Sequence, residues 1–217
     1  MNRSFSTLTA IYKDRILIGI LIIFYTVGTV GILLPDKREY FLSLSFFNLL
    51  LSFTIVLLAR RTQFLQFLVF LVICYFTGMT AEWIGTKTGL LFGNYAYGAN
   101  LGSKWSGVPL VIGINWGILV VTSASLISRA KLPVLISAVL SSLVMTFLDV
   151  IMEPVAMKSD FWNWENGVIP FYNYICWFMI SLPLHLIYFK FKLSETNKVF
   201  DSLFIILTLF FTLLNVF

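Results

Sequence analysis

The sequence is poor in charge. Asp, Glu, Lys and Arg make up only 12% of its 217 residues, against about 25% in an ordinary soluble domain. Hydrophobic residues make up 59%, and the mean hydropathy is +0.92. This composition excludes an ordinary soluble enzyme and predicts an all-α integral membrane protein. The length leaves room for one compact bundle and none for a separate soluble domain, so we expect a single transmembrane helical domain over residues 1–217.

Residues that serve metal and nucleophilic chemistry are also scarce. One histidine, His185, excludes a metal site built from several histidines, and no Cys or His spacing predicts zinc, haem or iron. Cys74 and Cys176 both lie in apolar runs, where free thiols behave as small hydrophobic groups. The glycines match no phosphate or dinucleotide loop, and no serine lies in a GxSxG turn. We therefore expect neither metal nor cofactor, and we interpret His185 as a helix–helix hydrogen-bonding group.

Long apolar runs dominate the chain instead. A membrane-spanning helix needs about 20 such residues, and the sequence predicts a bundle of about seven. The first run lacks a small-residue cleavage site, so we expect a retained helix rather than a signal peptide. Two long loops, Glu82–Gly107 and Met152–Val168, interrupt the pattern. The expected spans are Ile16–Leu34, Phe41–Ala59, Phe64–Ala81, Val108–Ile127, Leu132–Ile151, Ile169–Phe189 and Phe200–Phe217.

The basic residues predict an orientation. They produce a net charge of +5, but they cluster in short loops beside apolar runs, which is typical of a membrane protein and excludes nucleic acid as the expected partner. Ten Lys and Arg fall on the side of the N-terminus and five on the other side. We expect a multi-pass protein of the cell inner (plasma) membrane with its N-terminus in the cytoplasm and its C-terminus outside. Both long aromatic-rich loops then lie on the non-cytoplasmic face.

The two loops resemble each other. Each begins near an acidic residue, passes through aromatic residues, and closes with a Gly-Val, a Pro, an Asn and a Trp. The closing segments are GVPLVIGINW (Gly107–Trp116) and GVIPFYNYICW (Gly167–Trp177). If a helix pair had been duplicated, the two acidic helix ends would lie near each other across a pseudo-axis.

Carboxylates at membrane depth are the first candidates for chemistry, because ionisable groups are costly there. Glu82 follows the third apolar run, and Asp149 and Glu153 lie near the end of the fifth, where Pro154 predicts the end of the helix. Ser142, Thr146, Asp149 and Glu153 form one stripe at helical spacing. These acids are either interfacial groups, solvated or paired with loop lysines, or partly desolvated acids that donate a proton.

Aromatic residues gather at the same face, including all six tryptophans. An aromatic belt is one interpretation, but a belt is expected at both interfaces, and the cytoplasmic helix ends contain no Trp. Electron-rich ring faces can also stabilise a cationic intermediate, and asparagine amides can orient a water. The candidate substrate-binding residues are Trp83, Phe92, Tyr95, Tyr97, Asn115, Trp116, Trp162, Trp164, Asn173 and Trp177.

These motifs resemble the membrane-bound carotenoid hydratase family, whose members are also described as carotenoid biosynthesis proteins and include bisanhydrobacterioruberin hydratases and carotenoid 1,2-hydratases. The resemblance covers residues 82–177. It is carried by EWIGTKTGLLFGNYAY (Glu82–Tyr97), the later GVP and NW, DVIMEPVA (Asp149–Ala156), FWNW (Phe161–Trp164) and GVIPFYNY (Gly167–Tyr174).

The resemblance implies cofactor-independent addition of water to the terminal isopropylidene double bond of an acyclic carotenoid end group, which produces a tertiary alcohol. We expect Asp149 to donate the proton and Glu82 or Glu153 to hold the water or complete the proton circuit. Aromatic rings would stabilise the tertiary cation. The implied partners are the carotenoid, membrane lipids, water and other enzymes of the carotenoid pathway. The alternatives are a carotenoid end-group cyclase, which shares the protonation step, and a non-catalytic lipid-binding or small transport protein.

Overall fold

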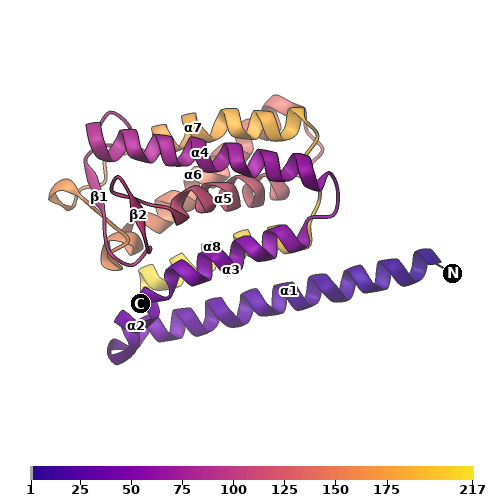
Figure 1. Cartoon of the computed structure of the whole chain (residues 1–217), viewed down its shortest axis with the longest axis horizontal. Helices are drawn as coiled ribbons and strands as arrows, with labels where there is room; N and C mark the ends of the chain where they lie inside the picture. Colours follow the sequence, from indigo (N-terminus) through magenta and orange to yellow (C-terminus); the bar gives the residue numbers. More distant parts are fainter. Residues whose placement is uncertain (1) are drawn as a thin grey trace.

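The computed structural model describes residues 2–217, with side chains from residue 11 onward. Arg3, which enters the charge count, therefore lies outside the described side chains. The described helices form one bundle (Figure 1). They are α1 (Asn2–Leu33), α2 (Arg38–Ser43), α3 (Ser45–Ala59), α4 (Phe64–Thr88), α5 (Val111–Ser128), α6 (Val134–Lys158), α7 (Phe171–Lys190) and α8 (Lys198–Val216). Short 3₁₀ turns cover Pro35–Lys37 and Glu165–Gly167.

Helix α5 occupies the centre of the bundle. It packs against α3, α4, α6, α7 and α8, and 72% of it is buried. His185 links α7 to α5 and α6. Its ring nitrogens lie 3.0 Å from the hydroxyl of Ser123 on α5 and 2.9 Å from that of Ser142 on α6. The expected helix–helix role of His185 is confirmed.

Within the described residues, five helices are long and apolar enough to cross a membrane. Helices α2 and α3, bent by 53°, would together make a sixth. Helix α7 has 20 residues, about the length of a membrane span, but its buried face carries Asn173, Ser181 and His185, which lower its hydropathy. A multi-pass membrane protein is thus supported. The count of seven spans, the plasma membrane and the orientation of the termini remain predictions.

Two helices extend further than the sequence predicts. Helix α4 continues past Ala81 to Thr88, and α6 continues through Pro154 to Lys158. The prediction that Pro154 ends its helix is wrong. Proline removes one backbone donor, but Val155 and Ala156 are buried and their packing holds the chain helical beyond it. The carboxylates therefore lie inside helices, between about one and three turns before the ends.

The two long loops pair with each other, which the sequence pattern did not predict. Strand β1 (Tyr95–Tyr97) runs antiparallel to β4 (Trp162–Trp164), with Tyr95 opposite Trp164 and Tyr97 opposite Trp162. Because side chains alternate along a strand, these four aromatic residues share one face of the ribbon. A second small pair joins β2 (Lys104–Trp105) to β3 (Val108–Pro109).

The β1–β4 ribbon lies at the same end of the bundle as the C-terminus, and α1 begins at the opposite end (Figure 1). The expectation that both loops open on one face therefore agrees with the fold. In the predicted loop Glu82–Gly107, the glycines Gly89, Gly93 and Gly102 have positive φ, as tight turns require. Gly85 instead lies within α4.

Candidate active site

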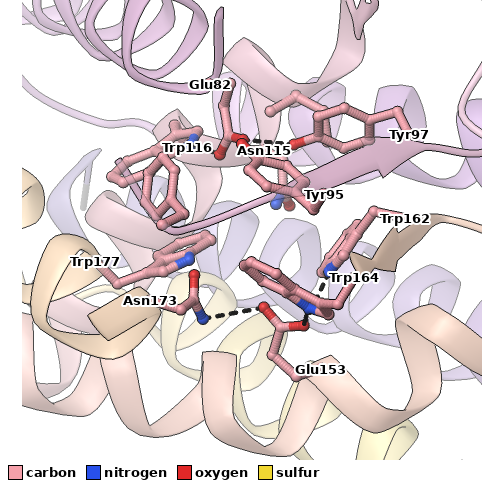
Figure 2. A pocket seen from close by; sticks show the side chains of 12 residues that line it. Glu82, Tyr95, Tyr97, Asn115, Trp116, Glu153, Trp162, Trp164, Asn173 and Trp177 are labelled. Atoms are coloured by element: carbon pink, nitrogen blue, oxygen red, sulfur yellow. Dashed lines mark hydrogen bonds between the residues drawn. The ribbon is translucent and has the colours of Figure 1, made fainter. Parts of the chain in front are cut away.

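Glu82 is a buried carboxylate with a full set of donors. It projects from α4 and is 3% exposed. The hydroxyls of Tyr95 and Tyr97 on β1 both donate to its Oε2, the latter at 2.8 Å. The indole Nε1 of Trp116 on α5 donates to its Oε1 at 3.1 Å. Figure 2 shows the phenols and the indole converging on Glu82 from separate elements.

Two glycines on the same face of α4 make this convergence sterically feasible. Gly78 and Gly85 lie about one turn before and one turn after Glu82. A Cβ at Gly78 would lie 2.4 Å from the Trp116 ring, and one at Gly85 would lie 2.9 Å from the Tyr95 hydroxyl. Gly85 falls within the loop predicted from Glu82 to Gly107, but it lies in α4, where the missing side chain leaves space beside the helix. The donors reach Glu82 because α4 has no side chain at either position.

We expect Gly85→Ala to displace Tyr95 from Glu82 and to lower the free energy of unfolding by about 1–3 kcal/mol, as other overpacked sites do. Gly19 is a matched control, because a Cβ there meets nothing within 4 Å. Gly19→Ala should be neutral or stabilising by up to about 1 kcal/mol, as expected for a half-buried helix position with open space beside it. Thermal unfolding in detergent measures both. Equal stability of the two variants would contradict the packing role of Gly85.

Glu153 is the second buried carboxylate, on α6, and is 1% exposed. Its Oε2 accepts hydrogen bonds from the indoles of Trp162 at 2.9 Å and Trp164 at 2.6 Å. Its Oε1 accepts one from the amide of Asn173 on α7 at 3.1 Å. The ribbon thus serves both acids: β1 supplies two phenols to Glu82, and β4 supplies two indoles to Glu153 (Figure 2).

Asp149 lies one turn before Glu153 on the same face of α6 and is 1% exposed. Asn173 Nδ2 donates to Asp149 Oδ2 at 2.9 Å, and the same nitrogen donates to Glu153. The other oxygen, Oδ1, is buried without a partner among the described groups. Glu82 and Glu153 each receive three donors, which suits an anion, whereas Asp149 receives one, which suits a neutral carboxylic acid.

A small cavity separates Glu82 from Glu153, and we call it the acid chamber. The space open to the centre of a water molecule is about 20 Å³, enough for about one water. Its lining residues are Glu82, Phe92, Tyr95, Tyr97, Ile112, Asn115, Trp116, Glu153, Trp162, Trp164, Asn173 and Trp177. Asp149 does not line it and lies behind Asn173.

Stacked aromatic rings form one wall of the chamber. Trp116 and Trp177 are nearly parallel, at 8°, with ring centroids 4.5 Å apart. Tyr95 packs on Trp164 at 4.9 Å. Ring faces of this kind attract positive charge, more strongly where water is excluded. The wall and the two carboxylates therefore create a site that favours a cation.

The two phenols remain hydrogen-bond donors over the physiological pH range. Burial raises the pKa of Tyr95 and of Tyr97 well above the ordinary value of 10.0, and the nearby charge of Glu82 raises each pKa further. Both β1 hydroxyls thus stay protonated and able to donate hydrogen bonds to Glu82.

Most predicted substrate-binding residues meet at the chamber, but Trp83 does not. It is 40% exposed and donates to Ser106 at 3.2 Å beside the Trp105 ring. Consecutive residues on a helix point about 100° apart, so Trp83 faces outward while Glu82 faces inward. Trp83 is an interfacial aromatic residue. Asn115 does line the chamber, as expected, and no side-chain hydrogen bond to it is found within the described part of the chain.

An apolar cavity adjoins the acid chamber, and we call it the inner cavity. It shares Ile112, Asn115 and Trp162 with the chamber and has about 60 Å³ open to the centre of a water molecule. Its lining also includes residues of α1, α3 and α8, where the sequence predicted no site residue, together with Leu101, Leu119, Met152 and Phe161. In the sequence, the polar residues Ser45 and Asn48 interrupt an apolar run. In the structure, both line this cavity.

Among the side chains of residues 11–217, no group of three or more His, Cys, Asp or Glu could hold a metal ion. The candidate site consists of three buried carboxyl groups, from Asp149 and Glu153 on α6 and Glu82 on α4, with a water-sized space and an aromatic wall.

Comparison with known proteins supports one assignment. No curated protein and no solved structure matches the chain. Residues 41–217, well over half of the chain, match the family described as carotenoid biosynthesis protein. That segment contains the acid chamber, its aromatic wall and the ribbon that closes it. The chain belongs to the carotenoid biosynthesis protein family, and a role in carotenoid biosynthesis follows from this membership.

Proposed function

We propose that this protein adds water to the terminal isopropylidene double bond of an acyclic carotenoid end group and forms a tertiary alcohol. One observation carries the proposal: two buried carboxyl groups, Glu82 and Glu153, line the same cavity, which has space for about one water molecule. An apolar cavity opens beside that space. Hydration of an alkene needs these three things together, namely a positioned acid, one held water and an apolar site for the hydrocarbon.

The proton comes from the acid pair on α6. Asp149 and Glu153 both bind one nitrogen of Asn173, and two neighbouring buried carboxyl groups do not both ionise easily. The pair therefore retains one proton. The unpartnered oxygen of Asp149 makes it the group on which the proton rests. At rest Glu153 is the anion of the pair. The proton passes from Asp149 to Glu153, one turn further along the same face of α6, and Glu153, which lines the chamber, then donates it to the substrate.

In the first step, the π electrons of the double bond form a C–H bond to the less substituted carbon, and the O–H bond of the acid breaks. The products are a tertiary cation and a carboxylate. The stacked pair Trp116 and Trp177 and the anionic Glu82 stabilise that cation. Electrostatic stabilisation prearranged in this way is commonly the largest contribution to catalysis.

In the second step, the oxygen of the chamber water forms a bond to the cationic carbon and loses a proton to Glu82. Asn115 and the donors around both acids orient the water. The proton later returns to the α6 pair through the next water that enters the chamber. The sum is one H and one OH added across the double bond, so the protein ends each cycle unchanged.

The test is to express the protein in a host that makes acyclic carotenoids, in ¹⁸O-labelled water, and to analyse the pigments by mass spectrometry. We expect a product heavier than the substrate by one labelled water. A product of unchanged mass would identify an end-group cyclase, because a cyclase quenches the same cation internally. Absence of any new product, with the protein present in the membrane, would contradict an enzymatic role on this substrate.

A further inference from the structure

We infer that a long polyene reaches the acid chamber sideways from the lipid, through a channel between α1, α3 and α8. This inference rests on the proposed function, because it names the route by which the substrate of that site arrives. The residues of α1, α3 and α8 that line this channel are not among the site residues predicted from the sequence.

A third cavity begins at the lipid-facing surface, and we call it the outer cavity. It has about 260 Å³ open to the centre of a water molecule. Phe24 and Val27 of α1 and Phe47 of α3 form its mouth, and each is more than half exposed. In a membrane protein, such exposed apolar side chains face the lipid tails, so the mouth opens into the bilayer rather than into water.

The three cavities share their walls in sequence. Ser45, Asn48 and Phe210 line both the outer and the inner cavity. Ile112, Asn115 and Trp162 line both the inner cavity and the acid chamber. The space open to a water molecule narrows along this route from about 260 to about 60 to about 20 Å³. The smallest of the three adjoining cavities is the one that the carboxyl groups of Glu82 and Glu153 line.

The lining identifies the occupant as an extended hydrocarbon chain. No charged side chain lines the outer or the inner cavity in the described part of the molecule. Aromatic rings such as Tyr25 and Phe210 border the route, with centroids 5.4 Å apart in an edge-to-face arrangement, and flat rings pack well on a flat conjugated chain. A phospholipid tail could enter the mouth but would gain nothing from carboxyl groups at the far end.

Gly28 on α1 provides the position for a test. It lines the outer cavity, and a Cβ there would meet only the Phe210 ring, at 3.9 Å. A small addition is therefore tolerated, whereas a leucine side chain would fill the passage. Gly19 lies on the same helix, and a Cβ there meets nothing within 4 Å. Helix α1 lies outside the family match at residues 41–217.

The experiment measures binding rather than turnover. Purified protein in phospholipid vesicles is titrated with an acyclic polyene, and its binding is followed by the quenching of tryptophan fluorescence, since four of the six tryptophans line the acid chamber. We expect Gly28→Leu to weaken binding by about tenfold or more and Gly19→Leu to change it less than about twofold. Ser45→Phe, where the outer and inner cavities meet, should weaken binding as Gly28→Leu does. Thermal unfolding confirms that each variant is folded.

The outcomes separate the channel from the proposed reaction. Unchanged polyene binding in folded Gly28→Leu and Ser45→Phe overturns the channel, whether or not the wild type hydrates carotenoids. Blocked binding in these variants, without any hydration by the wild type, supports the channel and overturns the proposed function. Vesicles with brominated acyl chains test the competing occupant: if Gly28→Leu relieves quenching by those chains and leaves polyene binding unchanged, the cavity holds a lipid tail and the proposal fails.

Discussion

Glu153→Gln and Glu82→Gln are each expected to lower the rate of carotenoid hydration by at least about 10²-fold, since general acid–base groups typically contribute 10²- to 10⁴-fold. Glutamine keeps the size of the side chain but carries no transferable proton and no charge. The first substitution removes the group that presents the proton. The second removes the group that accepts the proton of the attacking water and stabilises the cation. Incorporation of ¹⁸O from labelled water, at matched protein levels, measures the effect.

Glu39→Gln is the matched control, because Glu39 on α2 is an exposed carboxylate at the same end of the bundle. It should leave the rate within about twofold of wild type, as surface substitutions away from special features usually do. Both buried variants must be shown to be folded, because an amide NH₂ would face the donors around each acid. A folded Glu82→Gln or Glu153→Gln protein with near wild-type hydration would remove that carboxyl group from the mechanism.

Asn173→Leu is expected to lower the free energy of unfolding by about 3 kcal/mol or more. Removing one partner of a buried charged group typically costs this much, because the charge remains without compensation. The single nitrogen of Asn173 binds both Asp149 and Glu153, so its loss leaves the two buried carboxyl groups beside each other with no donor between them. Thermal or denaturant unfolding in detergent, monitored by circular dichroism, measures the change.

Two further variants test whether that loss of stability comes from the buried carboxyl groups. Asn163→Leu alters an exposed asparagine on the outward face of the ribbon, which bonds only to the exposed Asp160, and should cost about 0.5 kcal/mol or less. Asp149→Leu, added to Asn173→Leu, should recover part of the lost stability, because replacing a buried polar pair with apolar groups is often tolerated. A loss below about 1 kcal/mol for Asn173→Leu would mean that the acids do not depend on its amide.

The aromatic ribbon connects the two halves of the site. Its inward face provides two phenols to one acid and two indoles to the other, and its pairing sets the separation between them. One strand alone would serve only one carboxylate. The acid chamber therefore exists only when both loops are folded, which couples closure of the ribbon to assembly of the site.

The sequence alone determined the class of the protein and the identity of most site residues. Apolar runs of about 20 residues indicate spans without any tertiary information, because length and hydropathy are local properties. Glu82, Asp149 and Glu153 stood out because carboxylates at membrane depth are rare and costly. The tryptophans stood out because they gather at one end of the bundle and not at both.

Only the tertiary structure decided the position and orientation of each of these residues. Strand register, the space left by Gly78 and Gly85, the position of Asp149 behind Asn173 and the outward direction of Trp83 all depend on contacts between distant segments. So does the continuation of α6 through Pro154, where packing outweighs local preference. The channel walls of α1, α3 and α8 carry no chemical motif at all. Periodicity and composition report what each segment prefers by itself, whereas cavities and shared hydrogen bonds arise only where several segments meet.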